Sequence, residues 1–499
     1  MAPCCEDSED PSEGEAWSHE ASSALPVMWM ASGCEACVVQ VTTETHVADL
    51  KLQILNKVGV PLAEQRLFAG EEELAADSAR AALTLAAALQ LLRSQSDPRD
   101  TNLRHFDSYV CLEKLPEELE MVRLLGKSLF GTVELHRWKR DDGGSVTCAV
   151  KQMPNEFVNQ NKDKEANEWR VHMDQQNVPS VEDALTEIGI LTYLSRQRDL
   201  PLYILRLLGT FADTRCTYLM TEFAEGGELY GLAAASSRIS ELQIRTYAWQ
   251  LLQAVKYLHA HHIGHRDISL ENIILKDGAV RLMDFGMAAL LRPRPGAELL
   301  RYCRAVGKGA FRAPECYVPA GVESLAVRAP AGAGAGTVGC GAEVVLAEAL
   351  DGRGLCQVCL PPGAVPGRSC VAEVWGYTLP AADIFAVGIC LFNLTWHARP
   401  WGHAVLSDPY FVFARKHGIE ASLKAWHKTL LSPEAMRVLA AALSTSPGQR
   451  PSAEECLGFD WFAPVARARV PLHASKQGAT SVVPAAATLG PLQLARVLF

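Results

Sequence analysis

Apolar residues recur at the spacing of one helix face in three stretches of the chain. In residues 240–262 they lie three or four positions apart, as in a helix that buries one side. Residues 47–54 and 185–191 show the same spacing, and Gly59 and Pro61 follow the first of these stretches as stop signals. The pattern predicts three helices with buried faces formed by Val47, Leu50, Ile54, Leu185, Ile188, Leu191, Ile244, Tyr247, Leu251, Leu252, Val255 and Leu258.

Shorter apolar runs indicate strands. Residues 27–30 and 38–41 flank a turn near Gly33, which predicts a β-hairpin. Residues 343–346 and 357–360 are β-like runs, and turns rich in Pro and Gly follow the second of them. Both helices and strands are therefore expected, in a chain too long for one core.

The composition is that of a globular protein of two to four domains. Of 499 residues, 48% are hydrophobic and 21% charged, and the formal net charge is −10. An acidic balance argues against nucleic-acid or anionic-membrane partners, which bind through excess Lys and Arg. No stretch approaches the roughly 20 apolar residues of a membrane helix, so a soluble protein is expected.

The cysteines favour a reducing compartment. The chain has 15, scattered and odd in number, and no apolar secretory leader opens it. We expect free thiols in a cytoplasmic protein, with a nuclear location left open. Two Cys-x-x-Cys pairs, Cys34/Cys37 and Cys356/Cys359, lie over 300 residues apart without an accompanying His pattern, so zinc is not expected.

The most informative stretch runs from His265 to Asn272 and is followed by Asp284-Phe285-Gly286. It resembles the catalytic loop and metal-binding loop of eukaryotic protein kinases. By this resemblance, Asp267 accepts the proton of the substrate hydroxyl, and Asn272 and Asp284 hold Mg²⁺ ions. ATP would then be the second substrate.

Two upstream motifs resemble the phosphate-binding half of the same family. Residues 124–133 look like the glycine-rich loop, with Gly126, Ser128 and Gly131 against the phosphates and Ser128 in place of a glycine. Lys151, at the end of a Cys-Ala-Val-Lys run, would contact the α- and β-phosphates. Glu187, on a predicted helix, would hold the lysine in place.

Residues 218–229 resemble the hinge that joins the two lobes of a kinase. The resemblance implies that Thr221 borders the adenine pocket, that the backbone of Glu222 and Ala224 binds the purine edge, and that Glu228 meets the ribose. Apolar side chains would sandwich the ring, and the candidates are Val133, Ala149 and Ile274.

The segment that follows departs from the family. Residues 287–312 contain no Ser and no Thr, so phosphorylation of either type cannot control it. Arg266 resembles the arginine that binds a phosphate there in many kinases. The only hydroxyl is that of Tyr302 and the only carboxylate that of Glu298. We predict that the unphosphorylated segment is competent, with one of these two near Arg266.

A second departure concerns the cation beside the catalytic carboxylate. Ser/Thr kinases usually place a lysine where this chain has Ser269, and a threonine where it has Lys308. We hypothesise that the two have exchanged places and that Lys308 supplies the charge to the site. The alternative is a solvated surface lysine beside a weakened site.

Residues 26–93 resemble ubiquitin through Gly59-Val60-Pro61, residues 64–67 and Phe68-Ala69-Gly70. No Gly-Gly follows Arg93, so conjugation is not expected, and a β-grasp spacer without partners is the alternative reading. A protein of the ubiquitin system is the implied partner.

The expected fold is α+β and multidomain: a ubiquitin-like β-grasp, then a bilobal kinase with a β-rich N-lobe and a helical C-lobe. The expected boundaries are a disordered acidic leader at 1–25, a linker at 94–118, the kinase at 119–462 and a disordered tail at 463–499, with a polar insert at about 154–180 and a β-rich insert at about 320–375. The expected activity is phosphorylation of Ser/Thr in protein substrates with ATP and Mg²⁺. The alternative is a pseudokinase scaffold.

Overall fold

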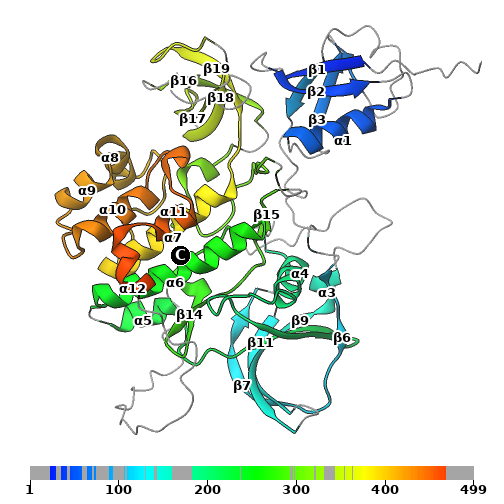
Figure 1. Cartoon of the computed structure of the whole chain (residues 1–499), viewed down its shortest axis with the longest axis vertical. Coiled ribbons are helices and arrows are strands. Elements are labelled where there is room, and N and C mark those ends of the chain that lie inside the picture. The colour runs from blue at the N-terminus through cyan, green and yellow to red at the C-terminus, as the bar shows by residue number, and fades with distance from the viewer. Residues whose placement is uncertain are drawn as a thin grey trace, which may run out of the picture.

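The computed structural model describes most of the chain (Figure 1). The described residues are 23–29, 35–41, 45–58, 65–69, 72–74, 89–93, 106, 109–129, 131–139, 143–159, 182–236, 238–292, 296, 298–319, 322–330, 343–352, 354–361 and 363–467. Most of the predicted leader, the tail after residue 467 and all of the polar insert expected at about 154–180 except residues 154–159 lie outside them.

The N-terminal unit is a five-stranded sheet with one helix. Its elements are β1 (Ser23–Trp29), β2 (Glu35–Val41), α1 (Val47–Val58), β3 (Gln65–Ala69), β4 (Glu72–Glu73) and β5 (Leu89–Arg93). The strand order is β2-β1-β5-β3-β4, with β5 parallel to β1. Leu50 and Ile54 of α1 are fully buried in a core with Val27, Val39 and Leu67, so the predicted hairpin and helix are confirmed.

A six-stranded, mainly antiparallel sheet forms the next lobe. Its strands are β6 (Glu113–Lys114), β7 (Leu119–Ser128), β8 (Gly131–Lys139), β9 (Ser145–Pro154), β10 (Leu207–Ala212) and β11 (Cys216–Glu222), in the order β6-β10-β11-β9-β8-β7. The short helix α3 (Asn155–Asn159) follows β9. This sheet carries the predicted glycine-rich hairpin at one edge and the predicted hinge at the end of β11.

Helix α4 (Ala184–Ser195) is buried along almost its whole length beside this sheet. Asp183 caps its N-terminus by accepting a hydrogen bond from Thr186 N at 3.0 Å. A Cβ added at Gly189 would lie 2.5 Å from the carbonyl oxygen of Phe106, so this helix and the preceding chain can approach only through a glycine. The helix is therefore fixed at its start and at its middle.

The third part is a helical lobe. Its helices are α5 (Leu229–Ala235), α6 (Glu241–Ala260), α7 (Leu379–Trp396), α8 (Pro409–His417), α9 (Ile419–Ala425), α10 (Pro433–Ala442), α11 (Ala453–Leu457) and α12 (Ala463–Arg467). Short elements complete it: β12 (Ile263–Gly264), η4 (Leu270–Asn272), β13 (Ile273–Lys276), β14 (Ala279–Leu282), β15 (Ala289–Leu290), η5 (Pro314–Cys316), η6 (Pro447–Gln449) and η7 (Asp460–Phe462). Ser240 and Gln243 form a capping box at the start of α6.

Helix α7 is long and apolar enough to cross a membrane by length and composition alone, with a mean hydropathy of 1.5. However, 72% of it is buried inside the protein. It contacts α6 and α10 and belongs to the main core. Its apolar character is explained by burial among other helices.

The predicted β-rich insert is a four-stranded antiparallel sheet, shown in yellow-green in Figure 1. The two predicted strands are confirmed as β17 (Glu343–Glu348) and β18 (Leu355–Leu360), and two further strands, β16 (Ser324–Arg328) and β19 (Ser369–Val374), pair with each other. Val327, Val358 and Val374 of this sheet lie in the same hydrophobic cluster as α6 and α7. The insert and the helical lobe therefore share one core.

Two expected boundaries differ from the structure. The linker expected to end at residue 118 already contributes β6 to the six-stranded sheet, and Phe106 is 5% exposed in the main core. At the other end, α12 continues the helical lobe to Arg467, beyond the expected boundary at 462. Both differences arise from pairing and packing with distant residues, which local polarity does not reveal.

Candidate active site

Asp383 of α7 fixes the loop from His265 to Asn272 through hydrogen bonds to its backbone. The Asp383 carboxylate accepts hydrogen bonds from the backbone N–H groups of His265 and Arg266, both at 2.9 Å, and its Oδ2 lies 3.0 Å from His259 Nε2. Burial alone would raise the pKa of Asp383, but the contact with His259 and the hydrogen bond from His265 N–H hold it below its usual value. Arg266 adopts a left-handed backbone conformation with φ of 67°. The loop is thus tied to the core through a buried carboxylate.

Asp267 is fixed at both of its carboxylate oxygens. Asn272 Nδ2 donates to Oδ2 at 2.7 Å, and the backbone N–H of Lys308 donates to Oδ1 at 2.9 Å. The side chain is nearly buried, which raises the pKa of Asp267, and the charge of Lys308 opposes this rise. The carboxylate therefore has one orientation and an adjacent cation.

Lys151 of β9 and Glu187 of α4 form an ion pair, with 2.7 Å between Nζ and Oε2. Burial would lower the pKa of Lys151, but the charges of Glu187 and Asp284 raise it above its usual value. The lysine is consequently a fixed cation facing the loop that carries Asp284. The predicted pairing of Lys151 with Glu187 is present in the structure.

The charge of Asp284 raises the pKa of both Lys151 and Asp267, so this carboxylate acts on both parts of the site. The preceding residue, Met283, donates its N–H to Asn272 O at 3.0 Å, which joins the two candidate metal-binding residues. Phe285 is fully buried, with its ring 5.1 Å from the His265 ring. The strand pair β13–β14 therefore sets the distance between Asn272 and Asp284.

The carboxylate of Asp284 and the amide oxygen of Asn272 are hard oxygen donors, and this set suits Mg²⁺. Within the described part of the chain, no group of three or more His, Cys, Asp or Glu side chains could hold a metal by itself. Mg²⁺ commonly takes one or two protein oxygens and completes its shell with phosphate and water. The donors present fit that mode of binding.

The glycine-rich stretch forms the hairpin between β7 and β8, where Ser128 pairs with Gly131. A Cβ at Gly131 would lie 2.0 Å from the carbonyl oxygen of Gln152, so only glycine fits there. Nothing lies within 4 Å of a Cβ built at Gly126. Val133 of β8 pairs directly with Lys151 of β9, which places the hairpin over the lysine.

The hinge residues lie at the end of β11, where Thr221 pairs with Ala149 of β9. The side chain of Glu222 is occupied, since it forms ion pairs with Arg281 at 3.1 Å and Lys276 at 2.8 Å. Its backbone N–H donates to Arg206 O at 2.9 Å, so neither this group nor the side chain is free for a ligand. Glu228 forms a β-bridge with Ile274.

Next to this bridge, Ala224 is buried, with 8% of its surface exposed. Burial and the nearby charge of Glu271 raise the pKa of Glu228. The structure therefore joins the predicted nucleotide-binding residues in pairs, through β8 with β9, β9 with β11, and Glu228 with β13.

Comparison with known proteins agrees with this geometry. Residues 119–324 match the family model described as protein kinase domain. These residues are thus similar to a protein kinase domain. The match stops where β16 of the insert begins, and the helical lobe resumes after the insert with α7.

The similar proteins include serine/threonine kinases. The chain is 48% identical over 84 residues to Aurora kinase of Schizosaccharomyces pombe, which covers 17% of this chain and 24% of that protein. It is 35% identical over 115 residues to serine/threonine-protein kinase SIK1 of Mus musculus (23% of this chain, 14% of the relative). It is 30% identical over 206 residues to cGMP-dependent protein kinase of Toxoplasma gondii (41% and 18%). The matches thus span less than a quarter of each relative.

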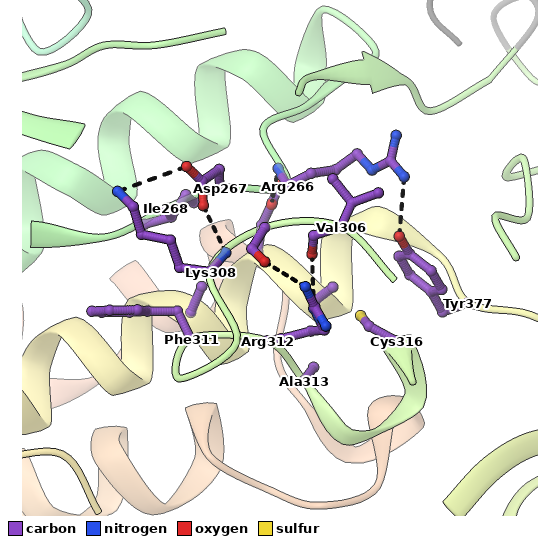
Figure 2. Close-up of a pocket in the computed structure, with 14 residues that line it drawn as sticks. Arg266, Asp267, Ile268, Val306, Lys308, Phe311, Arg312, Ala313, Cys316 and Tyr377 are labelled. Carbon is purple, nitrogen blue, oxygen red and sulfur yellow. Dashed lines mark hydrogen bonds and ion pairs between the residues drawn. The ribbon is translucent and has the colours of Figure 1, made fainter. Parts of the chain in front are cut away.

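Within the matched region, Lys308 extends toward Asp267 of the candidate active site. Its Nζ donates to Ser269 Oγ at 2.7 Å and to Asn272 Oδ1 at 3.2 Å, and lies 3.8 Å from Asp267 Oδ2. Figure 2 shows the ammonium group pointing at the Asp267 carboxylate. Lys308 is therefore not a solvated surface lysine, which was the alternative. It forms a hydrogen bond with Ser269, the residue with which it was predicted to have exchanged places.

Sequence reasoning missed Glu182, which also contacts the lysine of the kinase domain. Its Oε1 lies 3.5 Å from Lys151 Nζ, so the lysine faces two carboxylates and stays closer to Glu187. Burial, followed by the charge of Asp284, raises the pKa of Glu182 to about 7. No motif marks this residue. The only signal is an extra acidic residue just before the N-cap of α4.

The expectation for Arg266 is met by one of its two candidates. The guanidinium carbon lies 4.8 Å from the ring centroid of Tyr302. Glu298 forms no ion pair with Arg266 in the described part of the chain. A third residue, Tyr377, also contacts Arg266, and no motif in the sequence predicts this contact.

The chain that follows η6 is joined to η5 by an ion pair of Glu315 and Arg450. Arg450 Nη2 donates to Glu315 Oε2 at 2.8 Å, and Nη1 donates to Oε1 at 2.5 Å. Both side chains are completely buried. This bidentate pair links residues 135 positions apart in the chain.

Proposed function

We propose that the protein is an ATP- and Mg²⁺-dependent kinase that transfers the γ-phosphoryl group of ATP to Ser or Thr hydroxyls of protein substrates. The observation that carries this proposal is the closed ion pair of Lys151 with Glu187 at 2.7 Å, with the charge of Asp284 acting on both Lys151 and Asp267. Phosphoryl transfer in this family requires that pair together with the metal-binding aspartate. Similarity to proteins named as serine/threonine kinases supports the choice of hydroxyl.

In this proposal Asp267 accepts the proton of the incoming hydroxyl. Asn272 and the Lys308 N–H hold its two oxygens, so the carboxylate meets the hydroxyl in a fixed direction. Its buried position raises its pKa, which makes it a better base than an exposed carboxylate. Orientation thus comes from the two hydrogen bonds, and basicity comes from burial, which raises the pKa against the opposing effect of Lys308.

The charges on the phosphates meet two lysines. Lys151 binds the α- and β-phosphates while Glu187 holds its stem. Lys308 places its ammonium beside Asp267 and stabilises the charge on the transferred group. Asn272 and Asp284 would hold Mg²⁺, which neutralises charge on the phosphates when bound.

The test is an incubation of the purified full-length chain with Mg²⁺ and labelled ATP on a peptide library. We expect peptides with Ser or Thr to be labelled, and Asp267→Asn to reduce the rate about 100-fold or more, because the variant removes the base and keeps the shape. Nucleotide binding is measured in parallel by thermal shift. A wild-type chain that binds ATP and labels no peptide would refute the kinase and favour the scaffold.

We also propose that the N-terminal unit is a ubiquitin-like module that binds a protein of the ubiquitin system. Its support is the strand order β2-β1-β5-β3-β4, with β5 parallel to β1 and α1 packed against the sheet. Gln53 of α1 exchanges two hydrogen bonds with the backbone of Gln40 in β2, which fixes the helix across the strands. Such a rigid sheet suits binding better than a spacer role.

A further inference from the structure

We call residues 284–315 the activation segment. Residues 285–312 of this segment contain no Ser and no Thr. Its ordering therefore has to come from something other than a phosphate on those residue types. Arg266 is the cation that such a phosphate would meet. Within the described residues no carboxylate pairs with Arg266, whose guanidinium instead contacts two tyrosines.

Tyr377 is the first of these contacts, and it belongs to the chain that leaves the β-rich insert. Its hydroxyl accepts a hydrogen bond from Arg266 Nη2 at 3.2 Å and donates one to Arg304 O at 2.7 Å. Figure 2 shows the phenol directly in line with the guanidinium. One hydroxyl thus joins the catalytic loop to the activation segment.

Burial raises the pKa of Tyr377 to about 12, so the phenol remains neutral at physiological pH. It can therefore donate and accept at the same time, as these two hydrogen bonds require. Only 2% of the side chain is exposed. A hydrogen bond between a charged group and a buried neutral partner is among the stronger ones in proteins.

The backbone of Tyr377 also pairs with the activation segment. Tyr302 N donates to Tyr377 O and Tyr377 N donates to Tyr302 O, both at 2.9 Å. This two-way pairing holds the Tyr302 ring against Arg266. The Tyr302 hydroxyl in turn donates to Leu290 O at 2.6 Å, near the start of the segment.

The two residues before Tyr377 complete the contact. The Arg301 guanidinium lies 3.9 Å from the centroid of the Trp375 ring. Gly376 has a φ of 77°, and a Cβ there would lie 2.6 Å from Tyr302 O. Only glycine allows so close an approach, so residues 375–377, which we name the clasp, are shaped to the activation segment.

We propose that the clasp replaces activation-segment phosphorylation: Tyr377 holds Arg266 and Tyr302 so that the kinase domain is competent without a phosphate. Tyr377 is a positioning residue that acts through Arg266, and this inference rests on the proposed kinase activity. The insert also contacts the far end of the segment, where β18 lies against η5. Its shared core with α6 and α7 gives the clasp a rigid support.

The experiment compares full-length wild type, Tyr377→Phe and Tyr410→Phe after complete dephosphorylation, checked by mass spectrometry. Tyr410→Phe is the matched control, because that tyrosine is 57% exposed on α8. The readouts are kcat and KM for ATP on the best library peptide, and amide hydrogen exchange of residues 298–312. Tyr377→Phe should lower kcat roughly tenfold, leave KM for ATP nearly unchanged and speed the exchange.

The route through Arg266 is tested by the double variant. In an Arg266→Ala background, Tyr377→Phe should cause no further loss of kcat, and an additive loss would overturn the route. If Tyr377→Phe unfolds, Trp375→Leu takes its place with the same expected effects on exchange and kcat.

Three results would overturn or separate the claims. Loss of wild-type activity on dephosphorylation would overturn the proposed role of the clasp. A Tyr377→Phe variant with the kcat and the amide hydrogen exchange of the wild type would also overturn it. If the folded wild type transfers no phosphate, the kinase proposal fails, and exchange in residues 298–312 alone then decides the clasp. Faster exchange in Tyr377→Phe supports it, and equal exchange overturns it.

Discussion

Among single residues, the exchange between positions 269 and 308 has the clearest chemical consequence. The hydroxyl oxygen of Ser269 and the ammonium nitrogen of Lys308 are 2.7 Å apart. A lysine at either of the two positions would therefore bring its charge to the same part of the site. The lysine side chain is 40% exposed, and its amine reaches the site from the activation segment. Because Lys308 belongs to the activation segment, the position of this segment decides whether the lysine can stabilise the transition state of the proposed reaction.

We predict that Lys308→Ala lowers kcat by about 100-fold, as expected when a preorganised charge near a transferring group is removed. The pH profile should also change. Lys308 holds the pKa of Asp267 down against burial, so its removal raises that pKa and moves the acidic limb of kcat toward neutral pH. Steady-state kinetics across pH would measure both effects.

The matched control is Lys416→Ala, an exposed lysine of α8. The double exchange Ser269→Lys with Lys308→Thr should restore most of the rate, since it returns the cation to the usual position. An unchanged kcat in Lys308→Ala would refute the role of this lysine.

At the scale of elements, buried polar contacts hold two parts of the chain in place: the catalytic loop, and the segment after η6 that carries Arg450. Asp383 at the start of α7 fixes the catalytic loop, and Arg450 after η6 fixes η5 through Glu315. Such contacts stabilise an arrangement mainly because leaving one partner buried and alone is unfavourable.

We predict that Arg450→Met lowers the free energy of unfolding of the kinase domain by about 3–5 kcal/mol, because Glu315 is left charged in a fully buried site. Arg437→Met is the control, since it removes an arginine from an exposed pair with Glu434 and should cost less than about 1 kcal/mol. Urea denaturation gives both values. Equal losses in the two variants would contradict this account.

The whole molecule has separate cores for its N-terminal unit and its kinase domain. The buried cluster around Leu50 and Ile54 shares no residue with the cluster that contains α6, α7 and the insert. Each described core can therefore form from its own part of the chain. The insert behaves differently, because its buried residues belong to the larger cluster.

We predict that a chain of residues 106–467 folds and keeps kcat within about twofold of the full chain, while residues 23–93 fold by themselves. Calorimetry of the full chain should then show two transitions, and each fragment should reproduce one. Removal of residues 322–376 should instead unfold the kinase domain. A single cooperative transition of the full chain would refute the independence of the two cores.

Much of the site could be predicted because its residues lie in short linear motifs. Asp267, Asn272 and Asp284 are found through one loop, and Lys151 and Glu187 through their spacing from it, and the structure brings all five together. Lys308 was found because a lysine was missing at Ser269. Glu182 and Tyr377 were missed, since neither stands in a motif and each reaches the site from a segment adjoining an insertion.

The sequence by itself determined the periodic elements and the chemistry available along the chain, because helix faces, turn residues and motif spacing depend on neighbouring residues. It also determined that no Ser or Thr phosphate could form between residues 287 and 312. Only the tertiary structure decided that Tyr377 also meets Arg266, because Tyr377 lies 111 positions away and is placed by the shared core of insert and lobe. Contacts at such a distance depend on how whole elements pack, and no local pattern encodes them.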